Sequence, residues 1–104
     1  MKFIDSVKQI EGVGGTLETW MLDNGLTLCY WKDKTFYSLF LQYTDELYTG
    51  CIFNLLNHPY NGIDMKYGGL MPPRIKMEHK YFDKFIQLVE KLSIDDLKAD
   101  PFSG

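Results

Sequence analysis

The chain has 104 residues, of which 45% are hydrophobic and 24% are charged, and its formal net charge is −3. This length suits one domain with one core, and the composition is globular rather than disordered. Basic residues number 11 against 14 acidic ones, so nucleic acid is an unfavourable partner, because duplex binding depends on cations that neutralise phosphates. The apolar runs are too short to cross a bilayer and the first residues are not those of a signal peptide, so we expect a cytoplasmic protein without membrane contact.

The first ten residues have apolar side chains at helical spacing. Phe3, Ile4, Val7 and Ile10 fall at positions i, i+1, i+4 and i+7, with charged or polar residues between them. This pattern predicts a short amphipathic helix that ends at Gly12.

A β-hairpin is predicted next. Residues 16–22 and 26–32 are rich in Thr, Trp, Tyr and Leu, and an Asn24-Gly25 pair between them favours a two-residue type I′ turn. In that register Met21 pairs with Leu28, and both faces of the hairpin are apolar. One face carries Leu17, Met21, Leu26, Leu28 and Tyr30, and the other carries Trp20, Leu22, Cys29 and Trp31.

Two further apolar runs, 36–44 and 48–56, predict a third and a fourth strand, with Gly50 marking a bulge or a close approach of another segment. Residues 57–73 contain turn-forming pairs every few positions and predict a long Gly/Pro-rich loop, which a short strand at 63–67 would shorten.

The clearest helix is predicted over 78–93, where apolar residues recur at i, i+3, i+4, i+7 and i+10, and its start could extend back to Arg74. Ser93 would cap a final short turn through Lys98, and we expect a mobile tail at 99–104. The predicted fold is thus a single α+β domain. It is a four-stranded antiparallel meander flanked by an N-terminal and a C-terminal helix, in the order α-β-β-β-β-α.

No motif indicates catalysis. Cys29 and Cys51 lie within apolar runs and are expected to be buried, reduced thiols. His58 and His79 lack metal-ligand spacing, and the glycine run at 12–15 follows a predicted helix instead of preceding one, unlike a phosphate-binding loop. We therefore expect no catalytic residue, no metal and no cofactor.

The excess of aromatic residues is the feature that bears on function. The chain has two Trp, seven Tyr and seven Phe, and two short helices can cover only one face of a sheet. The other face would either meet a partner or pack under the 57–73 loop, and Tyr and Trp dominate binding hot spots. The candidate partner-binding residues are Trp20, Trp31, Tyr37, Tyr43, Tyr48, Tyr60, Tyr67 and Arg74.

The favoured hypothesis is a small non-catalytic protein-binding module that occupies the surface of another protein or of a second copy of itself. Small inhibitors and accessory proteins of phages and other mobile elements work in this way. One alternative is a ligand-binding domain or enzyme in which the 57–73 loop forms a lid. A second alternative is weak binding of single-stranded nucleic acid. The lid would bring together His58, Tyr60, Asp64, Lys66 and Arg74, and the nucleic-acid patch would use Lys32, Lys34, Lys66, Arg74 and Lys76.

Overall fold

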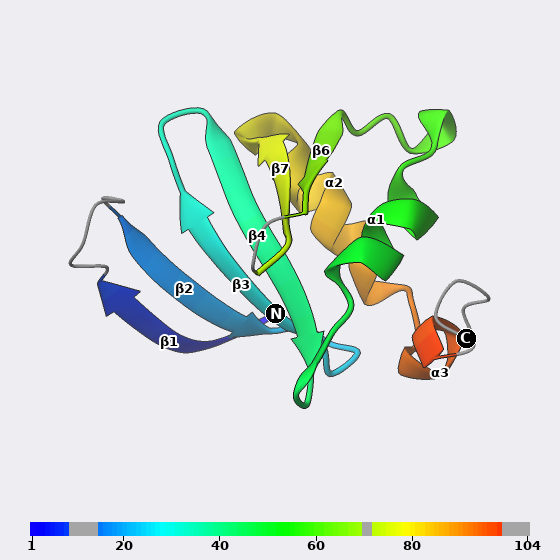
Figure 1. The fold of residues 1–104 in the computed structure, drawn as a ribbon, viewed down its shortest axis with the longest axis horizontal. Coiled ribbons are helices and arrows are strands. Elements are labelled where there is room, and N and C mark those ends of the chain that lie inside the picture. Colours follow the sequence, from blue (N-terminus) through cyan, green and yellow to red (C-terminus); the bar gives the residue numbers. More distant parts are fainter. Residues whose placement is uncertain (9–14, 70–71, 99–104) are drawn as a thin grey trace.

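The computed structural model describes residues 1–8, 15–69 and 72–98, and within them the chain forms one antiparallel sheet with helices packed against it (Figure 1). The sheet has seven strands in the order β1-β2-β3-β4-β7-β6, and β5 pairs with β4. The elements are β1 (Lys2–Lys8), β2 (Thr16–Met21), β3 (Thr27–Lys32), β4 (Phe36–Tyr43), β5 (Glu46–Leu47), α1 (Thr49–Leu56), the 3₁₀ turn η1 (Pro59–Asn61), β6 (Met65–Gly68), β7 (Arg74–Glu78), α2 (His79–Glu90) and α3 (Ile94–Lys98). The prediction of a four-stranded meander flanked by two helices is therefore wrong.

The predicted N-terminal helix is strand β1, at the edge of the sheet. It pairs with β2, and its register shifts between Phe3 and Asp5. Such a bulge adds one residue, here Ile4, and breaks the strict alternation of side chains along a strand. The apolar residues at positions 3, 4 and 7 therefore resemble a helical pattern although the backbone is extended. The predicted helix end at Gly12 lies outside the described residues.

The predicted fourth strand is mostly helix α1. A short apolar run does not distinguish a buried strand from a buried helix, and here Ile52 and Leu56, spaced i and i+4, turn the same side of a helix into the core. Gly50 does mark a close approach, because a Cβ at this position would lie 3.1 Å from the Tyr67 hydroxyl oxygen.

The predicted 57–73 loop contains structure of its own, namely η1 and strand β6. Arg74 to Glu78 form strand β7, so helix α2 begins at His79 and not at Arg74. The amphipathic helix itself is confirmed, and so is the final short turn, because the Asp96 backbone N–H donates to Ser93 Oγ over 3.0 Å. The predicted mobile tail at 99–104 lies outside the described residues.

The β2–β3 hairpin has a three-residue turn instead of the predicted two-residue turn. The Leu22 N–H donates to the Leu26 carbonyl over 2.8 Å, and Gly25 has a φ of 92°, which suits glycine. Trp20 consequently pairs with Leu28, and not with Cys29. A one-residue shift in register exchanges the faces of the strand, so the predicted sorting of side chains onto two faces is wrong.

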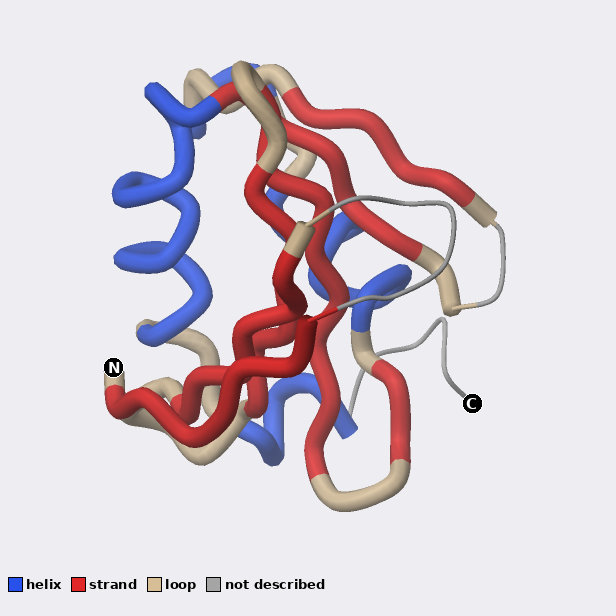
Figure 2. The backbone as a smooth tube through the Cα atoms, turned by 90° about the vertical axis from the view of Figure 1, so that its left-hand side faces the viewer, coloured by secondary structure: helices blue, strands red, loops and turns tan. Residues whose placement is uncertain are grey.

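The helices pack on one face of the sheet, which we call the covered face. Helix α2 runs along it (Figure 2), and Phe85 and Val89 of this helix have no exposed surface. α1 and α3 add to the same core, which also takes in strand residues. The core contains Leu22, Leu26, Leu28, Tyr30, Leu39, Leu41, Tyr48, Ile52, Leu56, Ile63, Met65, Ile75, Met77, Phe82, Phe85, Ile86, Val89 and Leu97. None of the described helices is long and apolar enough to span a membrane.

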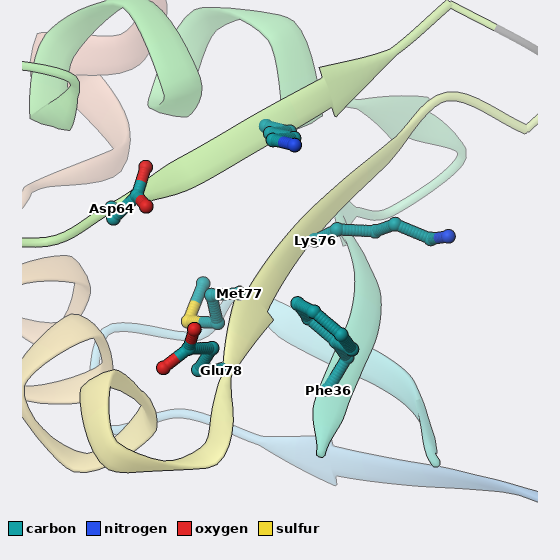
Figure 3. A pocket seen from close by; sticks show the side chains of 6 residues that line it. Phe36, Asp64, Lys76, Met77 and Glu78 are labelled. Carbon is teal, nitrogen blue, oxygen red and sulfur yellow. The ribbon is translucent and has the colours of Figure 1, made fainter. Parts of the chain in front are cut away.

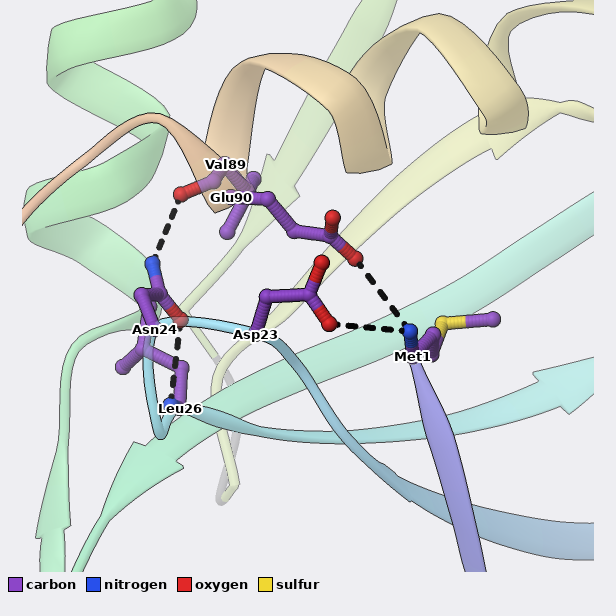
Figure 4. A network of polar contacts seen from close by, with 6 residues as sticks. All are labelled: Met1, Asp23, Asn24, Leu26, Val89 and Glu90. Carbon is purple, nitrogen blue, oxygen red and sulfur yellow. Dashed lines mark hydrogen bonds and ion pairs between the residues drawn. The ribbon is translucent and has the colours of Figure 1, made fainter.

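The hairpin turn is fixed to the end of helix α2 by one side chain (Figure 4). The Asn24 amide donates to the carbonyls of Val89 and Leu92, over 2.9 and 2.8 Å, and its oxygen accepts from the Leu26 N–H over 3.1 Å. The last carbonyls of a helix lack partners within the helix, and Asn24 supplies donors to two carbonyls at this end. The turn therefore holds β2 and β3 in place against α2.

Candidate functional site

The opposite side of the sheet, which we call the open face, is the candidate site. Side chains directly paired between antiparallel strands share a face, so the printed register assigns its members. Cys29 and Phe40 are only 6% and 9% exposed, yet neither belongs to the core cluster. The open face thus has a thin apolar layer of its own that none of the described helices covers. Its central and basic members are Leu17, Thr19, Met21, Cys29, Trp31, Phe36, Ser38, Phe40, Gln42, Lys66, Arg74 and Lys76.

Two neighbouring aromatic rings lie at the centre of this face, and a cation lies over one of them. The ring centroids of Trp31 and Phe40 are 5.9 Å apart. The guanidinium carbon of Arg74 lies 4.3 Å from the Trp31 ring centroid. A guanidinium stacked on an indole gains from the electron-rich ring face and keeps its edge donors available for a second contact.

Unpaired polar atoms gather at the same place. Among the described residues, the buried side-chain nitrogen and oxygen atoms without a hydrogen-bond partner are Trp31 Nε1, Ser38 Oγ and Arg74 Nε. Trp31 and Ser38 are direct partners across β3 and β4, and Arg74 stacks on Trp31. Buried polar groups are nearly always hydrogen-bonded in native proteins, so three exceptions at one point of the surface require an explanation.

The edge of the open face at β6 and β7 is basic. Lys66 and Lys76 are direct partners across these strands, and neither they nor Arg74 forms an ion pair with a described residue. Like charges placed opposite each other are destabilising, so this arrangement does not serve the fold.

A shallow pocket of about 270 Å³ opens beside these lysines (Figure 3). Lys76 and Phe36 extend to the same side of neighbouring strands there, and Asp64 and Glu78 lie at the other end. Glu78 already pairs with Lys80, the nitrogen and oxygen lying 3.3 Å apart. The pocket therefore joins the basic edge to one large apolar ring and, at its other end, to two carboxylates.

The cysteine of the open face is not a reactive one. Burial raises the pKa of the Cys29 thiol, and the Thr19 hydroxyl, 3.7 Å from the sulfur, only partly opposes this. The thiol stays protonated at neutral pH, and the protonated form is a poor nucleophile. Among the described residues, no three His, Cys, Asp or Glu side chains are placed to hold a metal ion.

Of the eight residues proposed from the sequence, two lie together on the open face, namely Trp31 and Arg74. Four pack on the covered side. Trp20 and Tyr43 contact the core, Tyr48 is buried within it, and Tyr37 stacks on Phe82 with ring centroids 3.9 Å apart. The same side holds Tyr30, whose pKa is raised by burial and by Glu18 to about 12.

The remaining two candidates lie on separate segments. Tyr67 stacks on Phe53 of α1, with ring centroids 5.3 Å apart. Tyr60 is 92% exposed on η1 and stacks on His58. The structure therefore does not gather the eight residues into one surface.

The residues proposed for a lid site are also divided. His58 and Asp64 line a wide, open hollow together with Tyr81. Lys66 and Arg74 belong to the open face, on the other side of the sheet from the core. The pocket beside Lys66 and the hollow beside His58 each contain only two of the five side chains named for that site.

Sequence reasoning did not select Ser38 and Phe40, which complete the centre of the open face, and it named Lys76 only for the nucleic-acid patch. The signal was present in the alternation of β4, where Phe36, Ser38, Phe40 and Gln42 fall at every second position. Reading it required the correct register of β3, because that register decides which residues stand beside Trp31.

The sequence matches no protein-family model and no curated protein, and the structure matches no solved structure. The case for function therefore rests on the chemistry of the open face itself.

Proposed function

We propose that this chain is a small protein-binding module that occupies the surface of a partner protein with its open face and carries out no catalysis. The observation that supports this is the placement of the helices on one face of a seven-stranded sheet. The other face presents Leu17, Met21 and Trp31 beside unpaired cations. An apolar surface rimmed by polar groups is typical of protein interfaces.

Charge favours a partner with an acidic surface. The chain carries a net charge of −3, yet Lys66, Arg74 and Lys76 stand together on the open face. Complementary charges speed association and orient the two proteins as they meet. A second copy of this chain would bring the same three cations to the interface, so a different, acidic protein is the better partner.

The aromatic residues of the open face do not support the nucleic-acid alternative. Single strands bind by stacking bases on exposed ring faces. Phe40 is 9% exposed, and the Trp31 ring already carries the Arg74 guanidinium, whereas Phe36, 44% exposed, offers a single ring face. Successive bases need successive ring faces, so these rings suit the apolar surface of a protein partner better than a single strand.

Position-specific photo-crosslinking in the native cell tests this proposal. A benzophenone amino acid would replace Met21 or Gln42 on the open face, and Asn54 or Gln87 on the helix side as matched controls. We expect defined protein adducts from the two open-face positions only. Lys76→Glu should abolish them, whereas Lys84→Glu, the same charge reversal on α2, should leave them intact. Adducts from the helix positions alone, or adducts indifferent to Lys76→Glu, would contradict the proposal.

A further inference from the structure

We propose that Trp31, Ser38 and Arg74 form a binding site for a carboxylate group, which an aspartate or glutamate of the partner protein supplies. This inference rests on the proposed function and adds to it the chemistry of the central contact. It concerns one cluster of side chains from three neighbouring strands, β3, β4 and β7.

The first argument is the supply of donors. Trp31 Nε1 and Arg74 Nε can only donate, and the Ser38 hydroxyl can donate as well as accept. All three atoms are buried, and none has a partner among the described residues. A cluster of unpaired donors is completed best by a group that only accepts, and an ionised carboxylate has two oxygens that each accept more than one hydrogen bond.

The second argument is charge. The Arg74 guanidinium forms no ion pair with a described residue, and Lys76 stands directly beside Ser38 across β4 and β7. Among the carboxylates on this side, Glu78 pairs with Lys80 and Asp5 accepts from the Ser6 N–H, while Asp64 lies in the pocket of Lys66 and Lys76 without an ion pair to either. The cluster therefore has an excess of positive charge that an incoming anion would neutralise.

The third argument is shape. The Arg74 guanidinium lies over the Trp31 ring, its carbon 4.3 Å from the ring centroid, and the Phe40 ring lies next to the indole with centroids 5.9 Å apart. A planar fork of donors matches a planar carboxylate in a bidentate pair. The Arg74 guanidinium lies over the indole, so rotation of this flexible side chain would uncover Trp31 and carry the positive charge to the incoming carboxylate.

The two indole N–H groups provide the readout for a test by NMR. Trp20 Nε1 donates to Glu18 Oε1 over 3.3 Å on the covered side and serves as an internal reference. ¹⁵N-labelled protein would be titrated with an N-acetylated, C-amidated hexaglutamate peptide. We expect a saturable downfield shift of the Trp31 indole proton and little movement of the Trp20 indole proton.

Variants then assign the site. Arg74→Gln should weaken peptide binding about tenfold or more, because hydrogen bonds to charged groups are the strong ones. Arg74→Lys, which keeps the charge and loses the planar fork, should weaken it less, and Ser38→Ala should weaken it without altering the fold. Lys84→Gln removes the same charge from exposed α2 and should bind like the parent protein.

Parallel titrations with inorganic phosphate and an oligothymidylate of eight residues separate this proposal from its rivals. Tighter binding of either probe than of hexaglutamate overturns the carboxylate assignment, as does a Trp31 signal that the peptide leaves unmoved. If that happens while the open-face crosslinks persist, only the carboxylate site is lost. If the crosslinks themselves fail, the proposed function is lost whatever the titration shows.

Discussion

The same strands form the covered face and the open face, but the two faces differ in whether their buried polar groups have hydrogen-bond partners. On the covered side, the buried Thr49 hydroxyl accepts from the Leu41 N–H over 3.0 Å, and Asn24 satisfies three backbone groups. On the open face, Trp31, Ser38 and Arg74 each bury a polar atom without a partner among the described residues. Paired groups stabilise the fold, whereas unpaired donors weaken it and become favourable only when a ligand completes them.

The largest effect expected from this difference is in core packing. Phe85 of α2 has no exposed surface, whereas Phe36 of the open face is 44% exposed. Phe85→Ala should lower the free energy of unfolding by about 3–5 kcal/mol, because it removes buried area and leaves a cavity. Phe36→Ala should lower it by less than about 1 kcal/mol. Urea unfolding followed by circular dichroism measures both, and equal losses would show that the two faces share one core.

The next effect concerns the link between the hairpin and α2. Asn24→Ala removes the donors to the carbonyls of Val89 in α2 and of Leu92 just beyond it, and the acceptor for the Leu26 N–H. We expect a loss of about 2 kcal/mol in the free energy of unfolding, since each net hydrogen bond contributes about 0.5–1.5 kcal/mol. Asn54→Ala, at an exposed position of α1, is the matched control and should change stability little. A harmless Asn24→Ala would mean that strand packing alone holds the turn against the helix.

A pair of hydroxyl deletions tests the comparison most directly. Thr49→Val keeps the side-chain shape but leaves the buried Leu41 N–H without its acceptor, which should cost about 1–2 kcal/mol. Ser38→Ala removes a buried hydroxyl that has no partner among the described residues, so it should be neutral or slightly stabilising. Thermal unfolding at matched pH ranks the two variants, and a larger loss for Ser38→Ala would show that Ser38 is paired within the fold.

The sequence predicts the elements that depend on local pattern. Helix α2 follows from the spacing of Phe82, Phe85, Ile86 and Val89, and the last short turn follows from Ser93. The existence of strands β2, β3 and β4 follows from their composition and the turn residues between them. These features need no knowledge of distant contacts.

The failures arise where distant contacts decide. β1 is extended because β2 offers it a pairing edge, and its bulge hides the alternation of its side chains. The hairpin turn has three residues, and Asn24 within it donates to the carbonyls of Val89 and Leu92, which lie 65 and 68 positions away in sequence. The shifted register places Trp20 beside Leu28 on the covered face, and the separate register of β3 with β4 places Trp31 beside Ser38 and Cys29 beside Phe40, so the candidate site could not be assembled from the sequence.

The smallest expected effect is a pH dependence at the end of α2. Burial, with the nearby Asp23 carboxylate second, raises the pKa of Glu90 above its usual value, although the terminal amine of Met1 lies 3.9 Å from one carboxylate oxygen (Figure 4). A carboxyl with a raised pKa in the folded state holds its proton more tightly there than in the unfolded chain. The favourable contribution of Glu90 to the stability of the fold is therefore complete below its pKa in the unfolded chain. It is lost as the pH rises through its pKa in the folded state.

Glu90→Gln makes this site permanently neutral, so it should unfold at slightly higher urea concentration than the parent protein at pH 7. The difference should shrink as the pH falls below about 4, where the parent carboxyl is protonated in both states. Asp83→Asn, at an exposed position of the same helix, corrects for the change in net charge. A Glu90→Gln variant that is less stable at pH 7 would mean that attraction to the Met1 amine outweighs burial and the Asp23 charge. In that case the ionised groups on the covered side would be paired as completely as its neutral polar groups. The two faces would then differ in the pairing of charges as well as in the pairing of hydrogen-bond donors.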